Sequence, residues 1–124
     1  MTRQAELIQE FKSLASIKID HLSVVENYKE AIKEAILIRE VENSFLDLFS
    51  QGKLNGTVHT CVGQELSAVA VCSSLKDNDW ITSNHRSHGH FISKTKLWKP
   101  LIDELRGLST GVCKGIGSSQ HLFH

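Results

Sequence analysis

The chain has 124 residues, of which 40% are hydrophobic and 23% are charged, as in ordinary globular proteins. Its 14 basic and 14 acidic side chains cancel, so no overall positive field favours nucleic acid or an anionic membrane, and a site for an anion must be local. Three widely spaced cysteines argue against a disulfide framework and suit a reducing cytoplasm. No segment approaches the roughly 18 apolar residues of a membrane span, and the start of the chain lacks the apolar core of a signal peptide. We therefore expect a cytoplasmic protein that binds neither nucleic acid nor membranes.

Residues 1–22 are polar and only weakly periodic. They predict an N-terminal arm that carries at most a short helix over residues 4–14. No residue in this arm suggests chemistry.

A long amphipathic helix is predicted from Ser23 to its end near Gly52. Ser23 and Glu26 have the spacing of a capping box, and a glycine commonly ends a helix. Apolar residues recur at helical spacing at Ala31, Ala35, Ile38, Val41, Phe45 and Leu48, with Ile32 and Phe49 widening the stripe. The opposite face is expected to present Lys29, Lys33, Glu34 and Glu42 to water or to a partner.

Two further segments follow this helix. Almost every residue of 64–75 is apolar or small, which fits either a buried helix or a buried strand; the length and the alanines favour a helix buried on all sides. Glu65 at its start is interpreted as a helix-start acid stabilised by the helix dipole. The Asp-Asn-Asp run at 77–79 would end the helix, and residues 80–82 predict a short strand.

The densest chemistry follows that strand. Four of the seven histidines gather with one arginine, at His59, His85, Arg86, His88 and His90. An arginine and an imidazole between a strand and the start of a helix suit a phosphate or diphosphate; the alternative is a surface arginine in a salt bridge. His59 could be an acid–base group or an ordinary loop histidine.

The other two histidines have two readings. With His85, His88 and His90 could bind zinc, although the paired cysteines of typical zinc sites are missing. Alternatively, one of the two is a packed helix residue whose ring nitrogens are bonded to the backbone.

The last third of the chain contains one helix and a glycine-rich segment. Pro100 suits the first turn of a helix over residues 101–105 that ends at Gly107. Residues 111–121 could place successive N–H groups around an anion. They match neither the phosphate-binding loop of nucleotidases nor the dinucleotide-binding glycine motif.

Taken in order, several motifs resemble one family. They are I-R-E-V-E, G-K-L-N-G-T-V-H, G-Q-E-L-S-A-V-A-V, S-N-H-R-S-H-G-H, E-L-R-G-L-S-T-G and G-I-G-S-S-Q-H. Over residues 31–121 the chain resembles the alpha subunit of the thiamine-diphosphate-dependent 2-oxo acid dehydrogenases, the decarboxylating first component of the pyruvate, branched-chain and acetoin complexes.

The resemblance implies an α/β fold, of which this segment would be mainly helical with one short parallel-type strand. Residues 23–124 would form the N-terminal portion of an incomplete thiamine-diphosphate-binding domain. The cofactor would lie between alpha and beta subunits, separate or fused, in an α2β2 assembly. The enzyme would decarboxylate a 2-oxo acid and pass the acyl group to a lipoyl-bearing acyltransferase.

The resemblance also assigns residues. His85 and Arg86 match the pair that contacts the cofactor diphosphate. His59 matches a histidine that borders the substrate approach, and His121 matches the histidine near the reacting thiazolium. The glycine-rich motif G-G-S-M-H corresponds here to Gly117, Ser118, Ser119, Gln120 and His121, with Gly117 and Ser119 expected to bind the cofactor and Ser118 replacing a glycine. The magnesium ligands would lie beyond position 124, so no metal ligand is expected here.

One competing interpretation belongs to another class. The chain could be a cofactor-free helical module or relic that docks on a partner subunit through residues 23–52.

Overall fold

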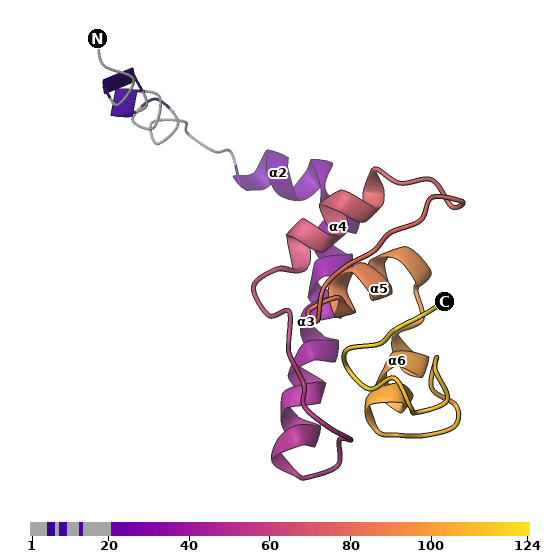
Figure 1. Ribbon diagram of the computed structural model, residues 1–124. Helices are drawn as coiled ribbons and strands as arrows, with labels where there is room; N and C mark the ends of the chain where they lie inside the picture. The colour runs from indigo at the N-terminus through magenta and orange to yellow at the C-terminus, as the bar shows by residue number, and fades with distance from the viewer. Residues whose placement is uncertain (1–4, 7, 10–12, 14–20) are drawn as a thin grey trace.

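The computed structural model describes residues 21–124, together with Ala5, Glu6, Ile8, Gln9 and Ser13. The predicted helix over residues 4–14 lies outside the continuously described residues, and so does the predicted arm except for residues 21 and 22, which belong to the first described helix. Five helices, α2 to α6, follow one another from residue 21 onward (Figure 1). None of the helices in the described part of the chain is long and apolar enough to cross a bilayer.

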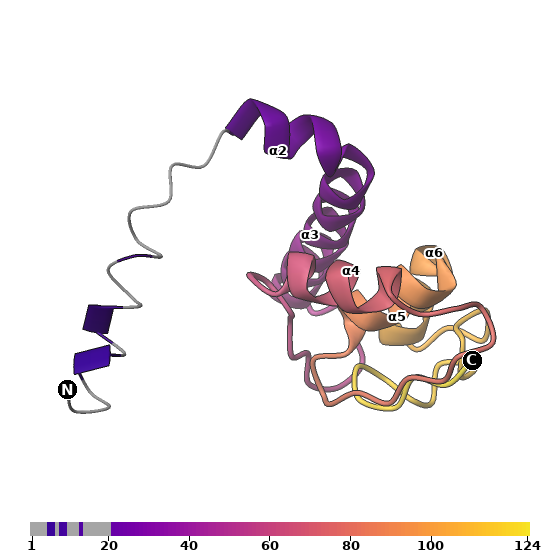
Figure 2. The ribbon, with the colours of Figure 1, turned by 90° about the horizontal axis from the view of Figure 1, so that it is seen from above.

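The predicted long helix is two helices, α2 (His21–Asn27) and α3 (Lys29–Ser50). They meet at Tyr28, whose ψ of 22° is not helical, and α2 turns away from the axis of α3 (Figure 2). The capping box is therefore wrong: Ser23 lies inside α2, where its hydroxyl accepts a hydrogen bond from Asn27 at 3.2 Å. The predicted end is confirmed, because Gly52 follows α3 with a φ of +65°.

The core forms around one face of α3. The predicted stripe is buried at Ala35, Ile38, Val41 and Phe45, whereas Phe49 is 56% exposed and does not belong to it. The apolar residues that join this stripe in the core are Cys61, Val69, Ile92, Leu101 and Leu105. Each large apolar side chain buried there stabilises the folded state by about 1.5–3 kcal/mol.

Glu42 overturns the prediction for the polar face of α3. It is fully buried beside the core stripe, one residue after Val41, and does not face water. A carboxylate can be buried in this way only if its oxygens accept hydrogen bonds.

Helices α4 (Glu65–Ser73) and α5 (His88–Thr95) pack against each other and against α3. Gly89 allows their close approach, since a Cβ there would lie 3.0 Å from the Cβ of Ala68. The helix predicted over 64–75 is confirmed, but not its burial on all sides. Leu66 and Val71 are 59% and 48% exposed, because no described segment covers that face of α4.

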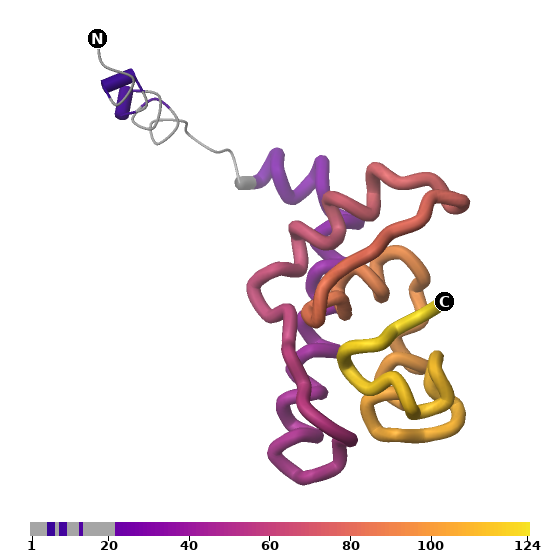
Figure 3. Tube along the Cα trace, in the orientation of Figure 1, coloured from indigo at the N-terminus to yellow at the C-terminus, as the bar shows by residue number. Residues whose placement is uncertain are grey.

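The strand predicted at residues 80–82 is wrong. After α4 the chain reverses direction, and residues 80–84 return toward the start of α5 in an extended conformation (Figure 3). No strand occurs in the described residues, because no described neighbour offers a backbone ladder, and Trp80 is 85% exposed. The described residues are thus helical, as expected for most of this segment, and they do not display an α/β fold.

Helix α6 (Trp98–Leu105) has Pro100 in its first turn, as predicted, although it begins three residues earlier. Gly107, with a φ of +72°, follows its end. The chain from there to residue 124 contains no helix or strand.

An ion pair joins α3 to the start of α4 and predicts acid sensitivity. The carboxylate of buried Glu65 accepts hydrogen bonds from Arg39 Nε at 2.5 Å and from the N–H of Gly63 at 3.0 Å. The hydrogen bond from Arg39 lowers the pKa of Glu65 from 4.5 to about 2 against the opposing effect of burial. A depressed carboxyl pKa stabilises the fold above about pH 4.5, and that stability is lost as the pH falls toward 2.

Glu65→Gln is therefore expected to cost about 1–2 kcal/mol at pH 7, and the difference from the wild-type protein should vanish as the pH falls toward 2. Urea unfolding at a series of pH values measures this. The control is Glu30→Gln, which removes an exposed carboxylate paired with Lys33 and should change little. Equal pH profiles for the two variants would contradict the assignment.

Candidate functional site

The structure brings together three of the predicted site residues, His59, His85 and Arg86. The rings of His59 and His85 meet edge to face, with centroids 4.9 Å apart. The guanidinium of Arg86 donates to the carbonyl of Thr60, which ties the arginine to the loop that carries His59. Residues about 26 positions apart in sequence thus form one surface.

This surface carries hydrogen-bond donors that suit an anion. His85 is exposed and Arg86 is half-buried, so part of the forked guanidinium faces solvent. The side chain of Asn84 accepts the backbone N–H of Arg86 at 2.9 Å and fixes the turn. Helix α5 begins two residues after Arg86, and its N-cap residue, Ser87, makes no side-chain capping bond, so the helix dipole adds positive potential nearby. Arg86 makes no ion pair with a described residue, which argues against the salt-bridge alternative.

His88 and His90 do not form a metal site. His88 is fully buried, with Nδ1 2.7 Å from Glu42 Oε1 and Nε2 2.8 Å from Ser119 Oγ. His90 Nδ1 lies 2.9 Å from Ser83 Oγ. No group of three metal-binding side chains occurs among the residues that the structure describes, so the zinc interpretation has no support there. The packed-histidine interpretation holds for His88, although its partners are side chains and not backbone.

The glycine-rich segment does surround an anion, but the anion is the chain's own Glu104. This fully buried carboxylate accepts four backbone N–H groups: Cys113 at 2.7 Å, Gly115 at 2.9 Å, Gly117 at 2.7 Å and Ser118 at 3.2 Å. Burial raises the pKa of Glu104, and the four donors together outweigh it, so that the pKa lies below its ordinary value. Sequence reasoning missed this residue, although a carboxylate on the buried face between Leu101 and Leu105 was a readable sign.

The remaining predicted residues lie in the same segment. Gly117 is buried, and Ser118 adopts a φ of +56°, which explains why a glycine can occupy that position. Ser119 is fully buried, and its hydroxyl is engaged by His88 and by the N–H of His59 at 3.4 Å. His121 is exposed and lines a different hollow, beside Cys113 and Ile116. The structure therefore links Ser119 to His59 but does not bring His121 into contact with that histidine.

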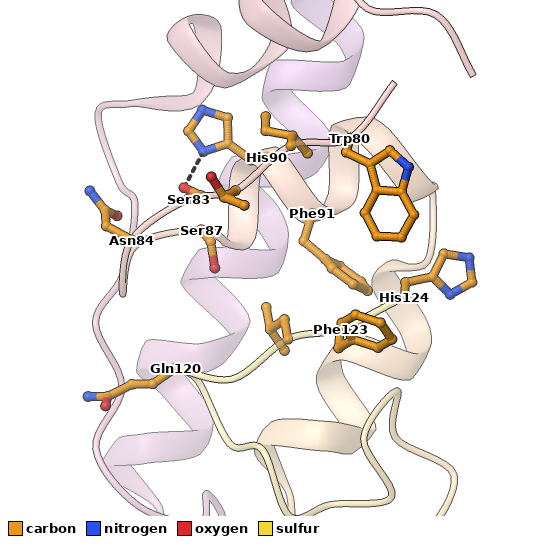
Figure 4. A pocket seen from close by; sticks show the side chains of 12 residues that line it. Trp80, Ser83, Asn84, Ser87, His90, Phe91, Gln120, Phe123 and His124 are labelled. Carbon is orange, nitrogen blue, oxygen red and sulfur yellow. Dashed lines mark hydrogen bonds between the residues drawn. The ribbon is translucent and has the colours of Figure 1, made fainter. Parts of the chain in front are cut away.

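A cavity of about 390 Å³ lies beside the His85–Arg86 turn. Trp80, Phe91 and Phe123 give it an aromatic side, and Ser83, Asn84 and Ser87 give it polar groups (Figure 4). It opens between the extended segment 80–84, helix α5 and residues 120–124. Such a mixed lining suits an organic ring whose charged end lies nearby.

The cysteines of this region are expected to differ in reactivity. Burial, and then the neighbouring Glu42 carboxylate, raise the pKa of Cys61 to about 12, which leaves about 10⁻⁴ of it as thiolate at pH 8. Cys113 is only half-buried. Iodoacetamide at pH 8 should therefore modify Cys113 in the folded protein and leave Cys61 intact, as peptide mass spectrometry would show. Modification of both at equal rates would contradict this picture.

Comparison with known proteins identifies the family. The sequence model of the dehydrogenase E1 component matches residues 33–124. The chain belongs to this family. The E1 resemblance seen in the sequence motifs is thereby confirmed.

Relatives of the E1 chain include three alpha subunits. The chain is 42% identical over 107 residues to the alpha subunit of acetoin:2,6-dichlorophenolindophenol oxidoreductase from Bacillus subtilis (strain 168), which covers 86% of this chain and 32% of the relative. It is 35% identical over 100 residues to the pyruvate dehydrogenase E1 alpha subunit of Rickettsia prowazekii (strain Madrid E), covering 81% of this chain and 31% of the relative. The chloroplastic pyruvate dehydrogenase E1 subunit alpha-3 of Arabidopsis thaliana is 31% identical over 118 residues, or 95% of this chain and 27% of the relative.

The E1 chain spans about a third of the length of these relatives. No solved structure matches it. The family and its relatives favour part of an E1 alpha subunit over a cofactor-free interaction module.

Proposed function

We propose that this chain is part of the alpha subunit of a thiamine-diphosphate-dependent 2-oxo acid dehydrogenase. The observation that supports it is the surface formed by His59, His85 and Arg86 at the start of α5. It joins two predicted cofactor-binding residues to a predicted catalytic one. The names of the relatives supply the reaction class.

The donor set fits the anionic end of the cofactor. A diphosphate needs cationic and N–H donors that are open to solvent, and exposed His85 and half-buried Arg86 provide them. The described residues offer no cluster of carboxylates for magnesium, so magnesium ligands would have to come from elsewhere in the protein. Gly117 and Ser119 would shape the cofactor site from within the fold, since the N–H of Gly117 is bonded to Glu104 and the hydroxyl of Ser119 is engaged by His88.

Thiamine diphosphate, when bound, supplies the nucleophilic carbon and the electron sink for decarboxylation. In this proposal His85 and Arg86 hold the diphosphate and neutralise its charge. An imidazole nitrogen of His59 orients the substrate or moves a proton at the substrate approach, and His121 does so from the other loop. Trp80 and Phe123 of the nearby cavity would offer aromatic surface to the organic part of the cofactor.

The proposed partners are a beta subunit in an α2β2 assembly and a lipoyl-bearing acyltransferase. The uncovered apolar face of α4, with Leu66 and Val71 exposed, supports burial against further protein. Three free cysteines support a place in the reducing cytoplasm.

Dye reduction tests the proposed activity. The full-length protein with its beta partner should reduce 2,6-dichlorophenolindophenol in a reaction that requires thiamine diphosphate and either a 2-oxo acid or acetoin. Comparing pyruvate, branched 2-oxo acids and acetoin as substrates would identify the specificity. No reduction with any of them, in a preparation that binds the cofactor, would contradict the proposal.

A further inference from the structure

A chain of buried polar side chains crosses the core. Glu42 of α3, His88 of α5 and Ser119 of the glycine-rich segment are each fully buried. His88 lies between the other two, 2.7 Å from Glu42 Oε1 and 2.8 Å from Ser119 Oγ. Burying ionisable groups is costly unless every polar atom is satisfied, and no buried side-chain polar atom in the described residues lacks a partner.

The acceptors set the direction of the hydrogen bonds that join the three side chains. Glu42 Oε2 already accepts the N–H of Cys61 at 2.9 Å, and its carboxylate can only accept the proton on His88 Nδ1. A neutral imidazole then has Nε2 free to accept the hydroxyl proton of Ser119. The hydroxyl oxygen in turn accepts the N–H of His59 at 3.4 Å.

The serine–histidine–glutamate order is that of hydrolytic triads, but a nucleophile must reach its substrate. Ser119 has no exposed surface, and its oxygen already faces the backbone of His59. Ser119 therefore cannot attack a substrate in this fold. The hydrogen bonds of Glu42, His88 and Ser119 instead hold together the segments that they join.

The segments joined by these hydrogen bonds include the loop that carries His59 of the candidate site. The two ends of the chain hold the same short loop, Ser119 at His59 and Glu42 at Cys61. The ring of His59 projects from this loop onto His85. We propose that Glu42, His88 and Ser119 are positioning residues, which fix His59 against His85 through a directed hydrogen-bond chain. The consequence for turnover rests on the function proposed above, whereas the consequence for the loop does not.

Hydrogen exchange and turnover together test this proposal in the full-length protein with its partner. Ser119→Ala should raise amide exchange over residues 58–62 about fivefold or more and lower kcat, with KM little changed. The matched control is Ser93→Ala, which alters another buried serine of the same core, on α5, and should leave both quantities at wild-type values. Ser119→Ala should also lower the thermal midpoint more than Ser93→Ala, since it leaves the buried Nε2 of His88 without its partner, so exchange over residues 58–62 is compared with exchange in the rest of the core of the same variant.

A second variant tests the direction of the chain. Glu42→Gln presents an amide N–H₂ to His88 Nδ1 and moves the imidazole proton to Nε2, so that Ser119 loses its acceptor. The double variant, Glu42→Gln with Ser119→Ala, should therefore exchange over 58–62 no faster than the faster of the two single variants. The proposal would be overturned if the exchange rates of the double variant rose by the product of the two single-variant increases. It would also be overturned if Ser119→Ala exchanged over 58–62 at the same rate as Ser93→Ala.

Hydrogen exchange and kcat together distinguish a failure of the positioning proposal from a failure of the proposed function. Faster exchange with unchanged kcat would overturn the positioning role. A wild-type protein without activity would instead count against the proposed function, and the exchange data would still decide whether the chain holds the loop.

Discussion

Replacing Glu104 by glutamine is expected to destabilise the protein by about 3 kcal/mol. Each carboxylate oxygen accepts two backbone N–H groups, Oε2 from Cys113 and Gly115 and Oε1 from Gly117 and Ser118. The glutamine side chain must direct an N–H₂ group at one of these pairs of donors. Two N–H groups would then face two others in a buried site, and urea unfolding at pH 7 would measure the loss.

Asp103→Asn is the matched control for Glu104→Gln, since it alters the neighbouring carboxylate of α6, which accepts one exposed hydrogen bond from Thr110. It should change stability by less than about 0.5 kcal/mol. Because the pKa of Glu104 is lowered in the fold, its contribution is complete above the ordinary carboxyl pKa of 4.5 and declines as the pH falls below it. Equal losses for the two variants at pH 7 would contradict the role given to Glu104.

Gly117→Ala is the second large effect that we expect, a loss of about 2–3 kcal/mol. A Cβ at this position would lie 2.0 Å from the carbonyl oxygen of His121. Both groups belong to the backbone of a tight turn in which the N–H of His121 donates to the carbonyl of Gly117 at 3.1 Å. The turn must open to admit the methyl group, and thermal unfolding would report the loss.

Gly52→Ala separates steric from conformational effects. Gly52 has a φ of +65°, and a Cβ added there would meet no atom within 4 Å, so the substitution carries only the cost of a left-handed residue, about 1 kcal/mol. Gly117 is not in the left-handed region, so its cost is purely steric. A larger loss at Gly52 than at Gly117 would contradict this reading of the turn.

Helix α3 could be predicted because its apolar residues follow one face, although the sequence did not show that α2 is a separate helix. The stripe from Ala35 to Phe45 is where α3 meets the core. Helix α6 has Pro100 in its first turn and Gly107 just after its end, as their backbone preferences favour. The prediction of a strand at residues 80–82 was wrong, because a strand depends on a neighbouring strand, which local β propensity does not show. The exposed face of α4 has the same origin, since an apolar composition does not show which side is covered.

The candidate site was partly visible in the sequence. His59, His85 and Arg86 were selected by residue type and motif, and the structure places them together. The burial of the two fully buried glutamates, Glu42 and Glu104, was not predicted. Glu42 was assigned to the solvent face because an analysis of helical periodicity treats every carboxylate as polar and does not consider its hydrogen-bond partners. The partner of Glu42, His88, lies 46 residues away in sequence. Only the folded structure therefore shows which groups satisfy the buried carboxylate of Glu42.

The binding of thiamine diphosphate by Arg86 variants tests the central claim most directly. Calorimetric titration of the full-length protein and its beta partner should show cofactor affinity at least about tenfold weaker for Arg86→Ala than for the wild-type protein, since a charge-assisted contact is worth about 1.5–3 kcal/mol. Arg106→Ala, which removes an exposed arginine at the end of α6, should bind as the wild-type protein does. Wild-type affinity in Arg86→Ala would contradict the assignment of this surface to the diphosphate.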